Sequence, residues 1–416
     1  MSAPLQSRTP AGYAWIVVAL LFPVALLNYL DRQMLATMKS SMVGDIPSIA
    51  NKADWGMVLA CFKWTYAVLS PFGGFIADRV SKRLVIGVSL LVWSAVTWWT
   101  GHVNSFHELI AARALMGVSE AFYIPTALAL ISEYHTGNTR SRAVGVHQAG
   151  IYVGQILGGF AGYAADSPEH GWRWAFSLCG MIGIIYAVPL LALLRDPARA
   201  KSESASGEIS APRENVFRGL LGNRNFLLLV LYFTLPAIAG WVVRDWMPDI
   251  LREKFGLGQG QAGVSAILYV QIAALVGVVI GGTLADRWMR VTPRGRIFTS
   301  AIGMVLFLPA LFSVGNASTL TIAIAGLIVF GFGWGFFDCN NMPILCQIAR
   351  PEWRATGYGI MNLVSISFGG FGDYAFGALR DRHMPLNVIF GAFAGLALLS
   401  VFIVLLIRPR DVKAVS

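Results

Sequence analysis

The chain has 416 residues, of which 56% are hydrophobic and 13% are charged, and its formal net charge is +10. Soluble domains carry about 25% charged residues, so this composition excludes a soluble protein with one anchor and indicates a multi-pass membrane protein. The basic residues lie mostly in short loops between apolar segments, which favours the positive-inside rule over nucleic-acid binding. Their excess on one side predicts that both termini are cytoplasmic.

Apolar segments long enough to span a bilayer, which takes roughly 20 residues, follow one another along the whole chain. There are twelve: 13–38, 55–77, 84–101, 107–132, 143–165, 174–194, 226–249, 262–285, 297–314, 319–346, 355–378 and 386–407. The first has no small-residue cleavage site, so we expect it to be retained. The polar stretch 195–225 separates the segments six and six. The sequence predicts an all-α membrane protein with two six-helix bundles, 1–194 and 226–416, joined by a cytoplasmic linker.

The two predicted bundles carry the same motifs at matching places, which indicates pseudo-symmetric halves. Gly74-Phe-Ile-Ala-Asp78-Arg79 closes the second segment, and Gly282-Thr-Leu-Ala-Asp286-Arg287 closes the eighth. Arg-Ala-x-Gly opens the fifth segment at Arg142 and the eleventh at Arg354. An aspartate at such a place can bind the positive end of a facing helix, and the arginines can bridge to acids on neighbouring helices. We therefore predict a cytoplasmic latch made of Asp78, Arg79, Arg83, Arg142, Asp286, Arg287 and Arg354. The alternative is that these are positive-inside loop charges only.

Ionisable residues inside apolar segments are costly and usually face a water-filled pathway. Asp31 and Arg32 lie in the first segment, and Arg113 and Glu120 in the fourth. Arg113 and Glu120 are about two helical turns apart and share one face. Burial raises the pKa of a carboxyl and a neighbouring Arg lowers it, so Glu120 can load and release a proton. Asp31 and Arg32 diverge by roughly 100° on a helix, which leaves Arg32 free to offer its fork to a carboxylate. A static Asp31–Arg113 ion pair is the alternative.

Several motifs together resemble the anion:cation symporter family of the major facilitator superfamily, which includes hexuronate, glucarate and vesicular glutamate carriers. They are the loop 74–83, Asn28-Tyr29-Leu30-Asp31-Arg32, Phe62-Lys63-Trp64-Thr65-Tyr66, Arg113 to Glu120, Gly171-Trp172-Arg173-Trp174 and Gly359-Ile-Met-Asn362. The resemblance implies that Asp31 and Glu120 carry protons. It also implies that Arg32, Tyr29, Tyr66 and Asn362 hold the substrate.

Some charged and polar residues depart from that family's pattern. Lys63 either reinforces anion binding in the cavity or balances a partner acid. Gln155 stands where an antiporter signature has proline, and it can also reach the cavity. Asp338 and Asp373 are either substrate contacts or inter-helix hydrogen-bond partners. The cysteines (Cys61, Cys179, Cys339 and Cys346) form no Cys-x-x-Cys pair, so no disulfide or metal site is predicted.

We therefore predict a monomeric carrier of the bacterial inner membrane that imports a small organic anion, such as a sugar acid, with protons. It needs no cofactor, and sodium is an alternative coupling ion. Spinster-type lipid carriers share the Asn-Tyr-x-Asp-Arg run and the Arg-x₆-Glu-Ala pattern, so a lysolipid carrier is the first alternative. An exporter or drug antiporter is the second, and Gln155 counts against it. No nucleophile triad or phosphate loop indicates an enzyme, and the short tails suggest no signalling domain.

Overall fold

The apolar segments of the sequence form long helices in a computed structural model, which describes residues 11–135, 139–197 and 216–409. Within these residues the secondary structure is helical throughout, without a strand. The first half contains α1 (Ala11–Thr37), α2 (Lys39–Asp45), α3 (Lys52–Arg79), α4 (Lys82–Thr100), α5 (Phe106–Glu120), α6 (Tyr123–Tyr134), α7 (Arg140–Phe160), α8 (Gly162–Asp166) and α9 (Gly171–Leu193).

The second half repeats this pattern with fewer breaks. It contains α10 (Val216–Leu221), α11 (Arg224–Phe255), α12 (Gln259–Met289), α13 (Gly295–Asn316), α14 (Leu320–Ile348), a 3₁₀ turn (Pro351–Trp353), α15 (Arg354–Asp381) and α16 (Leu386–Leu406). With α5 and α6 counted together, the long helices correspond one by one to the twelve predicted segments. Of the predicted linker, the structure describes 195–197 and 216–225, which include α10.

Nine helical stretches in the described part of the chain are long and apolar enough to cross a membrane, by length and composition alone. The exceptions among the twelve are α3, α7 and α15, whose polar residues lower their hydropathy. These three helices pack against the opposite half, α3 on α15 and α7 on α12. A helix that faces protein need not be as apolar as one that faces lipid, so their polarity follows from their position.

Local sequence signals fix several helix ends. The side chains of Ser81, Ser105 and Thr319 accept hydrogen bonds from the first turns of α4, α5 and α14, as N-caps do. The fourth predicted span is broken between α5 and α6. Pro125 explains this break, because a proline lacks the N–H and its ring clashes with the carbonyl four residues earlier. Glu120 consequently sits at the end of α5.

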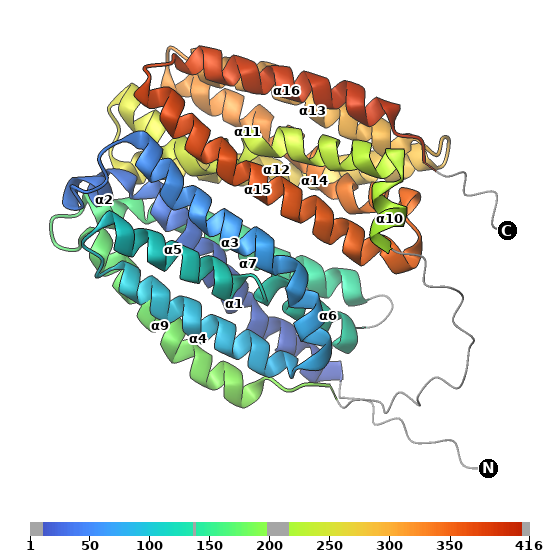
Figure 1. Cartoon of the computed structure of the whole chain (residues 1–416), viewed down its shortest axis with the longest axis horizontal. Helices are drawn as coiled ribbons and strands as arrows, with labels where there is room; N and C mark the ends of the chain where they lie inside the picture. The colour runs from blue at the N-terminus through green and yellow to red at the C-terminus, as the bar shows by residue number, and fades with distance from the viewer. Residues whose placement is uncertain (1–10, 136–138, 198–215, 410–416) are drawn as a thin grey trace.

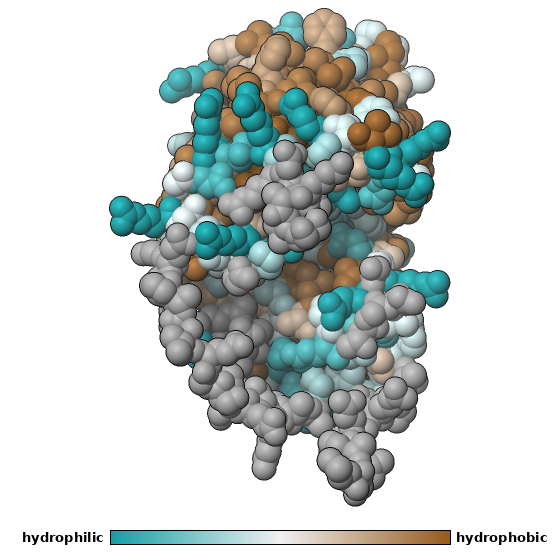
Figure 2. Space-filling model, turned by 90° about the vertical axis from the view of Figure 1, so that its right-hand side faces the viewer, coloured by the Kyte–Doolittle hydropathy of each residue, from teal (hydrophilic) through white to brown (hydrophobic). Residues whose placement is uncertain are grey.

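The two halves lie side by side, with α1, α3, α7 and α11, α12, α15 between them (Figure 1). We call the end with the start of α1 and the end of α16 the terminal end, and the opposite end the loop end. The halves meet closely toward the loop end, where a Cβ on Gly263 of α12 would come within 2.3 Å of the Gly159 carbonyl of α7. Seen from the terminal end, the molecule is hollowed between the halves (Figure 2).

Candidate functional site

Arg32 of α1 and Glu120 of α5 form an ion pair inside the first half. The Nε and one terminal nitrogen of Arg32 lie 2.6 and 2.5 Å from Oε2 of Glu120. Glu120 is fully buried, and its second oxygen, Oε1, has no hydrogen-bond partner. The sequence predicted that Arg113 and Glu120 share a face, and both are buried on α5. The direct partner of Glu120 is nevertheless Arg32, from another helix.

Aromatic rings surround the Arg32 guanidinium. Its central carbon lies 4.8, 4.6 and 5.0 Å from the ring centroids of Tyr29, Phe62 and Tyr66. Cations at this distance are attracted to aromatic faces by about 0.5–2 kcal/mol each, more when desolvated. The rings therefore hold a planar cation whose outward side remains available. Tyr29 and Tyr66 were predicted at this site from the sequence, but Phe62, next to Lys63, was not.

Asp31 points away from Arg32 into the first half. Its Oδ2 accepts a hydrogen bond from the Thr97 hydroxyl of α4 at 3.0 Å, and its Oδ1 is buried without a partner. Arg113 lies with its guanidinium carbon 4.4 Å from the Phe62 ring centroid, and it contacts the Met116 sulfur at 2.9 Å. The predicted divergence of Asp31 and Arg32 is observed. Thr97 was not identified from sequence, since a threonine in an apolar helix carries no specific signal.

A pocket at this depth lies between the halves, and five of the eleven side chains that line it are charged. It is lined by Tyr29, Arg32, Gln33, Leu59, Phe62, Lys63, Arg113, Gln155, Trp241, Arg244 and Asp245. Four of these are cations and one is an acid. The free volume is only about 20 Å³, so a ligand would enter only if side chains move apart. Tyr66 lies beneath Arg32, and Asn362 is partly buried on α15 outside this lining.

Lys63 joins the halves through two acids. Its ammonium group contacts Oδ2 of Asp245 on α11 and Oδ2 of Asp373 on α15. Its nitrogen also lies 4.5 Å from the Trp241 ring centroid. Lys63 has partner acids and also lines the pocket, so its predicted part in anion binding stays a prediction. Gln155 lines the pocket, and its side-chain Oε1 is buried without a hydrogen-bond partner.

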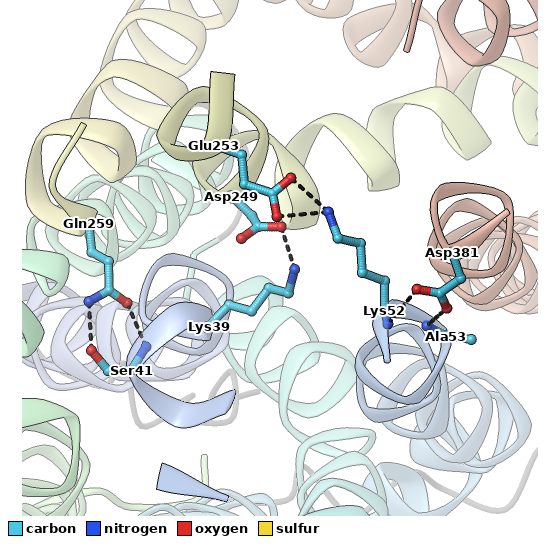
Figure 3. A network of polar contacts seen from close by, with 8 residues as sticks. All are labelled: Lys39, Ser41, Lys52, Ala53, Asp249, Glu253, Gln259 and Asp381. Carbon is cyan, nitrogen blue, oxygen red and sulfur yellow. Dashed lines mark hydrogen bonds and ion pairs between the residues drawn. The ribbon is translucent and has the colours of Figure 1, made fainter. Parts of the chain in front are cut away.

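A second set of polar contacts joins the halves at the loop end (Figure 3). Lys39 pairs with Asp249, and Lys52 pairs with Glu253 at 2.7 Å. The Asp381 carboxylate at the end of α15 accepts from the Lys52 and Ala53 backbone N–H groups at 2.9 and 2.8 Å, where α3 begins. A carboxylate is favoured at a helix N-terminus. These contacts join residues of opposite halves and hold the loop end together.

The predicted latch residues lie at the terminal end, where the halves are apart. Asp286 pairs with Arg296 at 2.9 Å, and Arg354 donates to the Cys346 carbonyl at 3.0 Å. Both contacts stay within the second half. The backbone N–H of Arg83 donates to Asp196 in the first half at 3.0 Å. Arg79, Arg142 and Arg287 are exposed, and the side chain of Asp78 lies outside the described residues. The latch thus remains a prediction for a state closed at this end.

Comparison with known proteins identifies the family of the chain. Residues 21–372 match the family model described as Major Facilitator Superfamily. Protein spinster of Drosophila melanogaster is 26% identical over 390 residues, covering 90% of this chain and 63% of that protein. Protein spinster homolog 1 of Homo sapiens is 27% identical over 400 residues, covering 89% of this chain and 74% of that protein. The chain therefore spans less than two thirds of the Drosophila protein.

Solved structures share the fold. A bacterial homolog of the human lysosomal transporter spinster, in an inward-facing and unoccupied conformation, has a TM-score of 0.76 and 21% identity, covering 95% of both chains. The nucleoside transporter NupG (D323A mutant) has a TM-score of 0.72 and 13% identity, covering 94% of this chain and 99% of that one. The predicted superfamily and fold are confirmed. The relatives are spinster proteins, the group that the sequence offered as an alternative to the anion:cation symporters.

Proposed function

This chain belongs to the major facilitator superfamily and is a membrane transporter, and we propose that it imports an organic anion in symport with protons. One observation carries the proposal. The pocket between the halves is lined by four cations and one acid, although the membrane-spanning helices as a whole are not cationic. The acids Glu120 and Asp373 lie behind this wall. A cationic wall at mid-depth attracts an anion and rejects a cation.

Arg32 and Glu120 offer a simple coupling mechanism. In the structure the Glu120 carboxylate occupies one side of the Arg32 guanidinium. Protonation of Glu120 removes that negative charge, so the guanidinium becomes free to bind the substrate carboxylate through two parallel hydrogen bonds. Proton and anion then each favour the binding of the other, because coupling between two ligands is reciprocal. Asp31, next to Arg32 but bonded to Thr97, would be a second proton carrier.

Alternating access then depends on the two ends of the molecule. With both termini cytoplasmic, the loop end faces the outside and the terminal end faces the cytoplasm of a bacterial cell. The contacts of Lys39, Lys52 and Lys63 across the halves support a shut outer side, and the hollow at the terminal end supports an open inner side (Figure 2). The latch at Asp78 and Asp286 would close the inner side after rocking of the halves. We propose that a monomer suffices, since each chain holds a complete pocket.

A lysolipid carrier is the second candidate, and the relatives named spinster favour it. Spinster-type lipid carriers share the Asn-Tyr-x-Asp-Arg run that contains Arg32. A lipid phosphate would take the same place on Arg32 as a carboxylate, because an arginine fork fits both groups. The two candidates differ in the rest of the substrate, polar in one and an acyl chain in the other.

The test is equilibrium binding of candidate ligands to the purified protein in nanodiscs at acidic and neutral pH. Hexonates, hexuronates, sialic acid, small carboxylates and lysolipids form the panel, and Arg32→Lys is the matched variant. We expect one carboxylate to bind, more tightly at acidic pH, and the variant to weaken it. Binding of a lysolipid alone would select the second candidate. Binding of no anion at all would reject both.

A further inference from the structure

Lys63, Asp245 and Asp373 form a buried triad in which two acids share one cation. Lys63 and Asp373 are 3% and 0% exposed, and Asp245 is 9% exposed. Both acids contact the same ammonium group through their Oδ2 atoms, so the two carboxyl groups are neighbours. The Oδ1 atom of Asp373 is buried without a partner.

The charges of this triad do not cancel. With both acids ionised the group carries one excess negative charge in a buried site, which is costly. Two adjacent carboxyl groups that cannot both ionise cheaply retain one proton between them. In the described part of the chain, no charged side chain on the surrounding helices other than Lys63 forms an ion pair with these two acids. Arg32 is paired with Glu120, Lys39 with Asp249, Arg113 lies on Phe62 and Arg244 lies on Trp241.

We propose that the Lys63–Asp245–Asp373 triad binds one proton and acts as a pH-sensitive lock of the loop end. Lys63 belongs to the first half and both acids to the second. Separation of the halves at the loop end pulls both acids off the lysine and into water, where carboxyls ionise at neutral pH. Closure then requires a proton to return to the acids.

The triad is also placed to pass this proton to the other side. Lys63 and Asp245 line the pocket together with Arg32, while Asp373 lies behind them. Once side chains part and the pocket opens toward the terminal end, the triad meets water there and can release its proton on that side. The transfer of the proton to the other side rests on the proposed proton coupling, but the pH-sensitive lock does not. The closed state binds more protons than the open state. Acidic pH therefore favours closure of the loop end, and alkaline pH favours its opening.

The experiment measures the distance between spin labels on Glu169→Cys and Arg382→Cys, two exposed loop-end positions in opposite halves. The native cysteines are replaced, and the protein is studied in nanodiscs without substrate between pH 5 and 9. We expect the ratio of open to closed molecules to rise with pH, by at most about tenfold per pH unit for one proton. Asp373→Asn should remove this dependence, because one acid remains for one lysine.

Two further variants keep the outcome decisive. Asp249→Asn breaks the one-to-one pair with Lys39, so it should favour opening at every pH while the pH dependence stays. If Asp373→Asn does not fold, Asp245→Asn replaces it, because this variant also leaves one acid for one lysine. All measurements are repeated with Glu120→Gln, so that failure of the proposed symport mechanism is separated from failure of the lock. The proposal is overturned if the wild type has no pH dependence, if Asp373→Asn keeps it, or if Glu120→Gln alone removes it.

Discussion

Asp31 and Arg32 are adjacent in the sequence but contact different helices: Asp31 accepts from Thr97 of α4, and Arg32 pairs with Glu120 of α5. Consecutive side chains on a helix point roughly 100° apart, which makes this possible. The acid is thereby kept away from the pocket, and the cation lines it. Substitutions at the two positions should consequently impair different steps of transport.

Glu120→Gln should abolish concentrative uptake while substrate exchange across the membrane continues. The amide cannot titrate, but it leaves Arg32 free to bind substrate. Proton-driven accumulation and counterflow in proteoliposomes measure the two activities separately. Glu133→Gln is the control, because Glu133 pairs with Lys82 at 2.9 Å on the exposed terminal side. Retained accumulation in Glu120→Gln would refute its role as proton carrier.

Arg32→Lys should raise the KM for transport by about 10- to 100-fold, since hydrogen bonds to charged groups contribute about 1.5–3 kcal/mol. Lysine keeps the charge but loses the planar fork and its fit between the Tyr29, Phe62 and Tyr66 rings. Initial uptake rates over a range of substrate concentrations give the KM. Arg218→Lys on the exposed face of α10 should have no effect. An unchanged KM in Arg32→Lys would place the substrate elsewhere.

Lys39→Met should shift the molecule toward opening at the loop end, and Lys52→Met should do so far less. Removal of one partner from a buried ion pair costs about 3–5 kcal/mol, whereas exposed pairs contribute about 0–1 kcal/mol. The side chains of Lys39 and Asp249 are 8% and 7% exposed, and those of Lys52 and Glu253 are 28% and 40% exposed. Alkylation of Leu59→Cys by an impermeant maleimide, applied from the loop-end side, reports the opening. Equal rates in both variants would contradict this ranking.

Gly154→Ala should lower thermal stability, by about 1–3 kcal/mol as for other overpacked sites. A Cβ at this position would come within 2.2 Å of the Leu26 carbonyl, because α7 and α1 pack closely there. Gly145→Ala on the same helix is the matched control, since its Cβ would meet nothing within 4 Å. Melting temperatures in detergent measure the difference. A Gly154→Ala variant as stable as Gly145→Ala would show that the helices can move apart freely.

The helices could be predicted from sequence because hydropathy and span length are local properties. The twelve segments match the observed long helices to within a few residues, except that α11 continues to Phe255 and Pro125 breaks the fourth. The ion pairs could not be predicted, because they join residues far apart in the chain. Lys63 and Asp373 are 310 residues apart, and only the packing of α3 on α15 brings them together.

Proton entry into liposomes is the most direct test of the proposal that Arg32 and Glu120 couple an anion to a proton. Purified protein is reconstituted with a trapped pH dye, and carboxylates and lysolipids are added in turn. We expect that one carboxylate acidifies the lumen and that Glu120→Gln abolishes the signal. Acidification that persists in Glu120→Gln, or uptake of the anion without any proton movement, would contradict it.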